Sequence, residues 1–134
     1  MRPLLLAALF ASVLCAEPVR WIGDYDAAVA EAKKTHHPLM LFLSKPHCKS
    51  CRFMKEKVLT DQKVQSYLKA HFVSAELDLN DRTLPEKYRM RLSPVFTFLD
   101  PEADEIVEQI IGGKKAPAFL ETLQDIIEEN PQFR

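Results

Sequence analysis

This chain of 134 residues has few cysteines, no internal repeats and almost no net charge. Its 18 lysines and arginines nearly balance its 19 aspartates and glutamates, for a formal net charge of −1, so nothing suggests a nucleic-acid partner. Three cysteines are too few for a disulfide-rich scaffold, and no second Cys-x-x-Cys completes a four-cysteine metal site. Because the chain also lacks internal repeats, low-complexity segments and nucleotide-binding motifs, we expect a single domain that needs no cofactor.

The first 16 residues have the layout of a secretory signal peptide. One positive charge precedes an apolar stretch, residues 4–14, which is too short to span a membrane. We expect cleavage after Ala16, export (in a bacterium, to the periplasm) and a mature domain at 17–134. Lipid attachment at Cys15 is the alternative, although Leu14 is bulkier than the residue that normally precedes a lipid-modified cysteine.

The cysteines outside that segment form a Cys-x-x-Cys motif, Cys48 to Cys51, between an apolar run at 39–43 and a predicted helix at 52–59. At a strand-to-helix junction the first sulfur lies at a helix N-terminus, where backbone N–H groups and the helix dipole stabilise an anion. Three side chains that can carry positive charge surround the pair: Lys45, His47 and Lys49. They too favour the thiolate, which is the nucleophile of disulfide exchange. The motif therefore predicts a redox centre with Cys48 as nucleophile and Cys51 as resolving thiol.

The motif has two alternative interpretations. A purely structural disulfide closes so small a loop here that it would constrain the unfolded chain little. A metal-binding or copper-delivery protein would use Cys48, Cys51 and His47, but a metal site needs three or four ligands. The remaining candidates are the other histidines of the chain: His36, His37 and His71. We interpret His36 and His37, which directly precede Pro38, as part of a solvated helix end.

Hydrophobic periodicity and turn residues divide the mature chain into helices and strands. Helices are predicted at four places: 25–34, 52–59, 62–70 and 116–128. Strands are predicted at four others: 39–43, 72–79, 95–99 and 105–111. Asp24 is a plausible N-cap for the first helix, and Thr60 or Asp61 for the third. The polar stretch 80–91 is expected to be a loop with solvated basic side chains and a short helix near 86–90.

The short connection between the last two predicted strands makes them an antiparallel hairpin. The earlier strands are joined through helices, which favours parallel pairing with right-handed crossovers. The expected architecture is therefore an α/β fold with a mixed central sheet and helices on both faces.

The motifs together resemble the thioredoxin fold over most of residues 20–128. The Cys-x-x-Cys, Ser93-Pro94 at the start of the hairpin and Gly112-Gly113 after it occur in the family's order. Within that superfamily the chain is similar to exported thioredoxin-like proteins related to the C-terminal domain of the disulfide-reductase transporter DsbD. Four stretches carry this likeness: Trp21, 25–34, 45–51 and 72–78.

The resemblance implies roles for Ser93 and Pro94. Pro94 matches the family's cis-proline, which lies against the redox cysteines. The backbone of Ser93 would then pair with an extended substrate segment.

Two positions depart from the family pattern. His47 stands where thioredoxins usually have tryptophan, and it could shift the thiol pKa, transfer a proton or contact partners. Phe42 stands where many thioredoxins bury an acid, so the proton acceptor for Cys51 is unassigned. Glu76 on the adjacent strand is a candidate; a surface-facing Glu76 is the alternative, because alternation alone does not decide its face.

The predicted function is thiol–disulfide exchange on exported proteins, with the chain acting as a disulfide reductant. The expected partners are protein thiols and disulfides and a redox donor protein, either soluble or in the membrane. An oxidase or isomerase of the same fold is the alternative within the class, and metal delivery is the alternative outside it. We expect a monomer.

Overall fold

The structure, a computed structural model, describes residues 17–103 and 105–134. The predicted signal peptide and the alternative lipid attachment at Cys15 lie outside these residues. Within the described ranges no helix is both long and apolar enough to cross a membrane.

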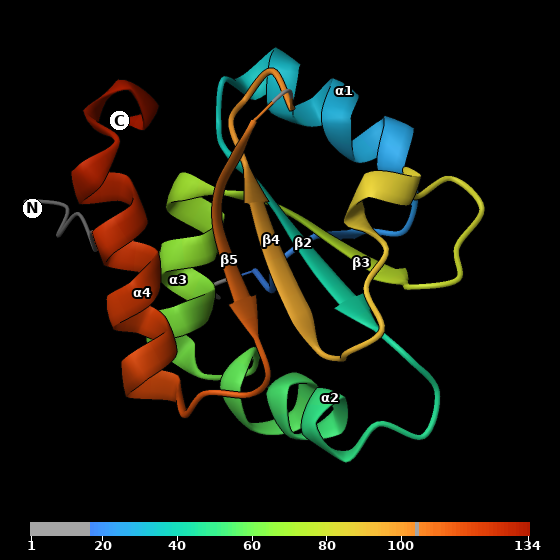
Figure 1. The fold of residues 1–134 in the computed structure, drawn as a ribbon. Coiled ribbons are helices and arrows are strands. Elements are labelled where there is room, and N and C mark those ends of the chain that lie inside the picture. Colours follow the sequence, from blue (N-terminus) through green and yellow to red (C-terminus); the bar gives the residue numbers. More distant parts are fainter. Residues whose placement is uncertain (1–16, 104) are drawn as a thin grey trace, which may run out of the picture.

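A five-stranded mixed sheet forms the centre of the fold, with the strand order β1-β3-β2-β4-β5 (Figure 1). Its strands, in chain order, are β1 Trp21–Ile22, β2 Leu39–Ser44, β3 Val73–Asp78, β4 Val95–Leu99 and β5 Ile106–Ile111. Strand β3 runs parallel to β1 and β2, whereas β4 is antiparallel to β2 and β5 is antiparallel to β4. The expected parallel start, antiparallel hairpin and mixed sheet are therefore confirmed.

Helical segments connect and cover the strands. In chain order they are α1 Tyr25–Thr35, α2 Lys49–Phe53, the π-helix η1 Met54–Val58, α3 Gln62–His71, the 3-10 helix η2 Glu86–Tyr88, α4 Ala116–Glu129 and the 3-10 helix η3 Pro131–Phe133. Helices α1 and α3 begin at the expected caps. The Asp24 carboxylate accepts a hydrogen bond from Ala27 N at 2.8 Å, and that of Asp61 accepts from Lys63 N and Val64 N.

The sheet separates two apolar cores, because successive side chains of a strand point to opposite faces. On β2, Leu39, Leu41 and Leu43 pack with residues of α1, whereas Met40 and Phe42 pack with residues of α3 and α4. All five are fully buried. The continuous apolar run thus forms a central strand covered on both faces, as the sequence predicts.

The structure differs from the sequence-based expectation around the Cys motif and at the sheet edge. The helix after Cys48 begins at Lys49 rather than at Arg52 and passes into a π-helix, which ends with Leu59 N donating to Met54 O at 2.8 Å. Strand β1 was not expected, because two residues are too few to show an alternating pattern.

Candidate functional site

Three chain segments meet at one end of the sheet: the connection from β2 into α2, the segment entering β4, and the turn leaving β5. Figure 1 shows α2 below β4 and β5, next to the segment that enters β4 and the turn that leaves β5. Backbone pairing holds the second and third segments together, because Gly112 N donates to Pro94 O at 2.8 Å.

Cys48 and Cys51 form a disulfide in this structure, with their Cα atoms 5.2 Å apart. Cys48 is the N-cap of α2, and its Sγ accepts a hydrogen bond from Cys51 N at 3.2 Å. Cys51 lies one turn further on, only 4% exposed, within the apolar core, whereas Cys48 is partly exposed. The difference in exposure matches an attacking sulfur outside and a second sulfur inside.

Ser93 reaches the redox pair from the segment that enters β4. Its hydroxyl donates to Cys48 Sγ at 3.4 Å, although the two residues lie 45 positions apart. The Ser93–Pro94 peptide bond is cis, the geometry that the resemblance implied. A second contact joins the same two segments, because Lys45 Nζ donates to the carbonyl oxygen of Arg91 at 2.6 Å.

The turn after β5 packs against the helical segment that follows Cys51. A methyl group on Gly113 would lie 3.7 Å from Met54 Sδ and 3.8 Å from the Phe53 ring, an ordinary contact distance. The next residue, Lys114, donates its backbone N–H to Met54 Sδ at 3.3 Å. Met54 is fully buried, so it supports both this turn and the cysteine helix.

His47 immediately precedes the redox pair and is exposed. Its backbone lies in the left-handed region, with φ 59°, a conformation in which histidine is more common than most non-glycine residues. This conformation turns the chain between the end of β2 and Cys48.

Glu76 lies on the sheet face that Cys51 also contacts. It pairs in register with Phe42, and Phe42 and Cys51 belong to the same apolar core. The Glu76 side chain keeps 28% exposure and forms an ion pair with Lys55 Nζ at 2.6 Å. Sequence reasoning left both faces open for this carboxylate and did not anticipate its pairing with Lys55.

Phe42 stands at the position where many thioredoxins bury an acid. It is fully buried and stacks on Phe96 at 4.8 Å between ring centroids, and Trp21 packs edge-on against it at 6.3 Å. The core beside the redox helix is therefore aromatic at this position.

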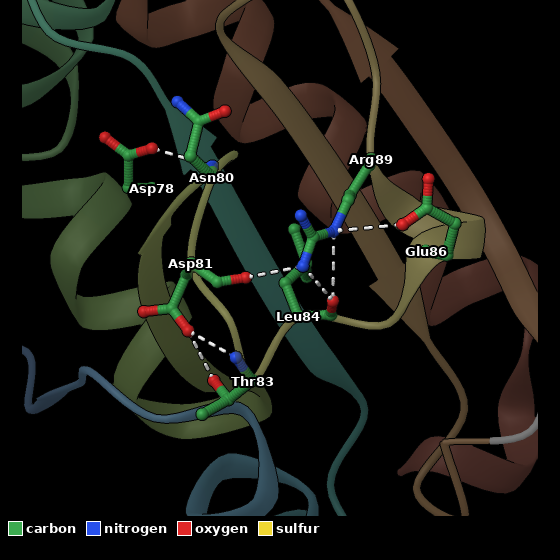
Figure 2. Close-up of polar contacts among 7 residues, drawn as sticks. All are labelled: Asp78, Asn80, Asp81, Thr83, Leu84, Glu86 and Arg89. Carbon is green, nitrogen blue, oxygen red and sulfur yellow. Dashed lines mark hydrogen bonds and ion pairs between the residues drawn. The ribbon is translucent and has the colours of Figure 1, made fainter.

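A polar loop between β3 and β4 carries the chain to Ser93 (Figure 2). The Arg89 guanidinium donates to the carbonyl oxygens of Asp81 and Leu84 and forms an ion pair with Glu86 at 3.5 Å. The four basic residues of this stretch, Arg82, Lys87, Arg89 and Arg91, are exposed as expected, and Arg89 in addition satisfies two carbonyl oxygens of the loop.

The turn that begins this loop is built around Asp81. Its carboxylate accepts from both the hydroxyl and the backbone N–H of Thr83, and these bonds lower the pKa of Asp81. Thr83 Oγ1 in turn accepts from Tyr25 N at 3.3 Å, which ties the loop to the start of α1.

A metal site is not apparent at the motif. Among residues 17–103 and 105–134, no group of three or more His, Cys, Asp or Glu side chains is placed to hold a metal ion.

A family model described as a thioredoxin-like domain matches residues 25–127. The thiol:disulfide interchange protein DsbD 1 of Pseudomonas aeruginosa is 33% identical over 107 residues, which cover 76% of this chain. The chain spans only 18% of the length of that relative.

Solved structures show the same fold. A thioredoxin from Thermus thermophilus superposes with a TM-score of 0.70 at 30% identity, covering 82% of this chain and 88% of that one. The DsbD C-terminal domain of Neisseria meningitidis, in its oxidised form, superposes with a TM-score of 0.61 at 18% identity, covering 79% and 98%. The resemblance inferred from the motifs is therefore confirmed.

Proposed function

The chain belongs to the thioredoxin-like domain family, and from this premise we propose that it is an exported disulfide reductant. As a thiol:disulfide oxidoreductase of the thioredoxin and DsbD type, it uses the Cys48–Cys51 pair. The proposal adds the direction of exchange, the protein substrates and export, the last on the strength of the signal-like residues 1–16.

In the proposed reaction, the Cys48 thiolate attacks one sulfur of a partner disulfide. A mixed disulfide forms between Cys48 and the partner, and the partner's other sulfur leaves as a thiolate that takes up a proton. Cys51, after losing its proton, attacks Cys48 Sγ and releases the second partner thiol. The partner gains two electrons and two protons, and the Cys48–Cys51 dithiol becomes the disulfide seen here. A dithiol donor protein would restore the reduced pair.

The observation that carries the proposal is the set of donors around Cys48 Sγ. The Cys51 backbone N–H and the Ser93 hydroxyl both point at this sulfur, which caps a helix. Hydrogen bonds to a charged group favour its charged form, and so does a helix N-terminus. The site is therefore suited to hold Cys48 as a thiolate, the reactive form.

Other residues receive supporting roles in this proposal. Glu76 is the proton acceptor for Cys51, because it lies on the same sheet face and is partly shielded from solvent. Ser93 and Pro94 bind the substrate segment next to Cys48, and His47, which is exposed and directly precedes Cys48, contacts the partner as well.

The reduction potential of the Cys48–Cys51 pair tests the direction of exchange. Equilibration of the protein with dithiothreitol or glutathione buffers is expected to give a value near −270 mV, as for thioredoxin. A value of about −180 to −120 mV would contradict the reductant role and indicate an isomerase or oxidase. The Cys51→Ser variant is the control for the mechanism, because it leaves Cys48 to form mixed disulfides that cannot be resolved.

A further inference from the structure

Positive charge is concentrated along the three chain segments that meet at Cys48, although the chain as a whole is nearly neutral. The sequence contains no aspartate or glutamate from 32 to 55, from 87 to 99 or from 109 to 120. These stretches include the three segments that meet at Cys48. All 19 acidic residues therefore lie outside these three segments, although Asp78 ends β3 beside Ser44 at the same end of the sheet.

Four cations of these stretches belong to the segments that meet at Cys48. Lys49 follows Cys48 directly, and Arg52 lies one helical turn later, with its backbone N–H donating to Cys48 O at 3.1 Å. Arg91 lies two residues before Ser93, whose hydroxyl touches Cys48 Sγ. Lys115 follows the turn that packs on Met54.

Most of this charge is available to a partner. Lys49, Arg52, Arg91 and Lys115 are exposed. Among residues 17–103 and 105–134, the only ion pairs are Lys55–Glu76 and Arg89–Glu86. None of these four cations therefore forms an ion pair within the described residues. We call Lys49, Arg52, Arg91 and Lys115 the cationic rim.

Two large apolar side chains are exposed within the same region. Phe53 is 40% exposed on α2, and Leu92 is 60% exposed immediately before Ser93. Exposed apolar groups flanked by charge are typical of a surface that contacts a protein segment rather than a small ion.

We propose that the cationic rim selects partner disulfides that are flanked by acidic residues, in protein segments that lie across Cys48. The inference rests on the proposed function and adds the chemical class of its substrate. Carboxylates near the partner disulfide would pair with the rim, and the field of the rim would raise the rate of encounter. Segments with lysine or arginine beside the disulfide would be repelled.

The test compares three disulfides with the pre-reduced protein in single-turnover reactions. Two are peptides with the same disulfide and apolar residues, one with flanking glutamates and one with flanking lysines; the third is 2-hydroxyethyl disulfide, which is small and uncharged. At low ionic strength we expect the acidic peptide to react about tenfold faster than the basic peptide or more. The ratio should fall towards one at about 1 M salt, where screening extends only about 3 Å.

Variants locate the effect on the molecule. The double variant Arg52→Gln/Arg91→Gln should reduce the acidic-to-basic rate ratio several-fold, and the single variant Arg91→Gln, which leaves α2 intact, should reduce it in part. The matched control is Lys33→Gln/Lys34→Gln, which removes the same charge from the exposed last turn of α1. It should leave the ratio unchanged. Taking the ratio within each variant cancels any change in the reactivity of the Cys48 thiolate.

Equal rates for the two peptides at low salt, with 2-hydroxyethyl disulfide still reduced, would overturn the selectivity and leave the proposed function intact. A ratio that survives in Arg52→Gln/Arg91→Gln would overturn the assignment to the rim. Failure to reduce any of the three disulfides would instead overturn the proposed function, and the inference with it.

Discussion

At the scale of single residues, the redox chemistry depends on what surrounds two sulfur atoms. Cys48 Sγ receives donors from two segments, while Cys51 is buried against the aromatic core. A buried thiol is difficult to ionise, because desolvation disfavours the charged form. The resolving step therefore needs a base within reach, and Glu76 is the carboxylate that we propose for it.

Replacement of Glu76 by glutamine should slow resolution of the mixed disulfide. The amide keeps the shape of the side chain but cannot accept the Cys51 proton, and a lost general base typically costs at least about 100-fold. We expect a loss of tenfold or more here, since water has partial access to the site, and a changed pH profile for the release of the reduced partner, measured by rapid mixing. The Lys55→Gln variant is the control, because it breaks the ion pair but keeps the carboxylate. Identical pH profiles for wild type and Glu76→Gln would exclude this role.

At the scale of elements, α1 shows how local chemistry determines the ends of a helix. Asp24 caps its N-terminus, Lys33 and Lys34 lie in its last turn, and His36 follows in the left-handed region with φ 58°. Positive charge at a helix C-terminus is favourable. A left-handed residue there is also common, but the residue is usually glycine.

The substitution His36→Gly should therefore stabilise the protein. A non-glycine residue in the left-handed region costs about 1–2 kcal/mol, and the greater freedom of glycine in the unfolded chain offsets part of the gain. We expect the free energy of unfolding to rise by about 0.5 kcal/mol, measured by urea denaturation.

The neighbouring His37→Gly is the matched control for that measurement. His37 is partly buried and its φ is not positive, so glycine there should bring the entropic loss and a loss of side-chain packing, with no relief of strain. Stabilisation by both substitutions would show that left-handed strain at position 36 is not the cause.

At the scale of the whole molecule, one sheet holds two cores together, and the stability of the fold is shared between them. Helices α1 and α3 both end at the edge where β2 and β3 begin, and His37 and His71 lie at these ends. The His71 ring packs on Tyr67 at 4.3 Å between centroids. Burial first, and then the nearby His37, lowers the pKa of His71.

The global stability should therefore decline in mild acid. The pKa of His71 is lower in the folded protein than the value of about 6.5 expected in the unfolded chain. Between these two pKa values the unfolded chain therefore binds more protons than the folded protein. Stability is lost from the unfolded pKa downward and levels off below the folded pKa. Unfolding by urea between pH 7.5 and pH 5 should show this decline, and His71→Gln should reduce it. An equally steep decline in His71→Gln would assign the effect to other groups.

The sequence alone determined the α/β class and the position of the redox motif, and it placed most of the helices and strands to within a residue or two. The apolar run at 39–43, the helix cap at Asp24 and the short connection before β5 are local features. Local features act through neighbouring residues, so a linear pattern records them.

The contacts that complete the site were decided by the tertiary structure. The Ser93 hydroxyl meets Cys48 Sγ across 45 positions, Glu76 pairs with Lys55, and the carbonyl of Arg91 accepts from Lys45. No periodicity records such pairs, because strand order and register determine which distant segments share one end of the sheet. The π-helix after Cys51 and the gathering of cations around Cys48 likewise depend on packing between segments that are far apart in the chain.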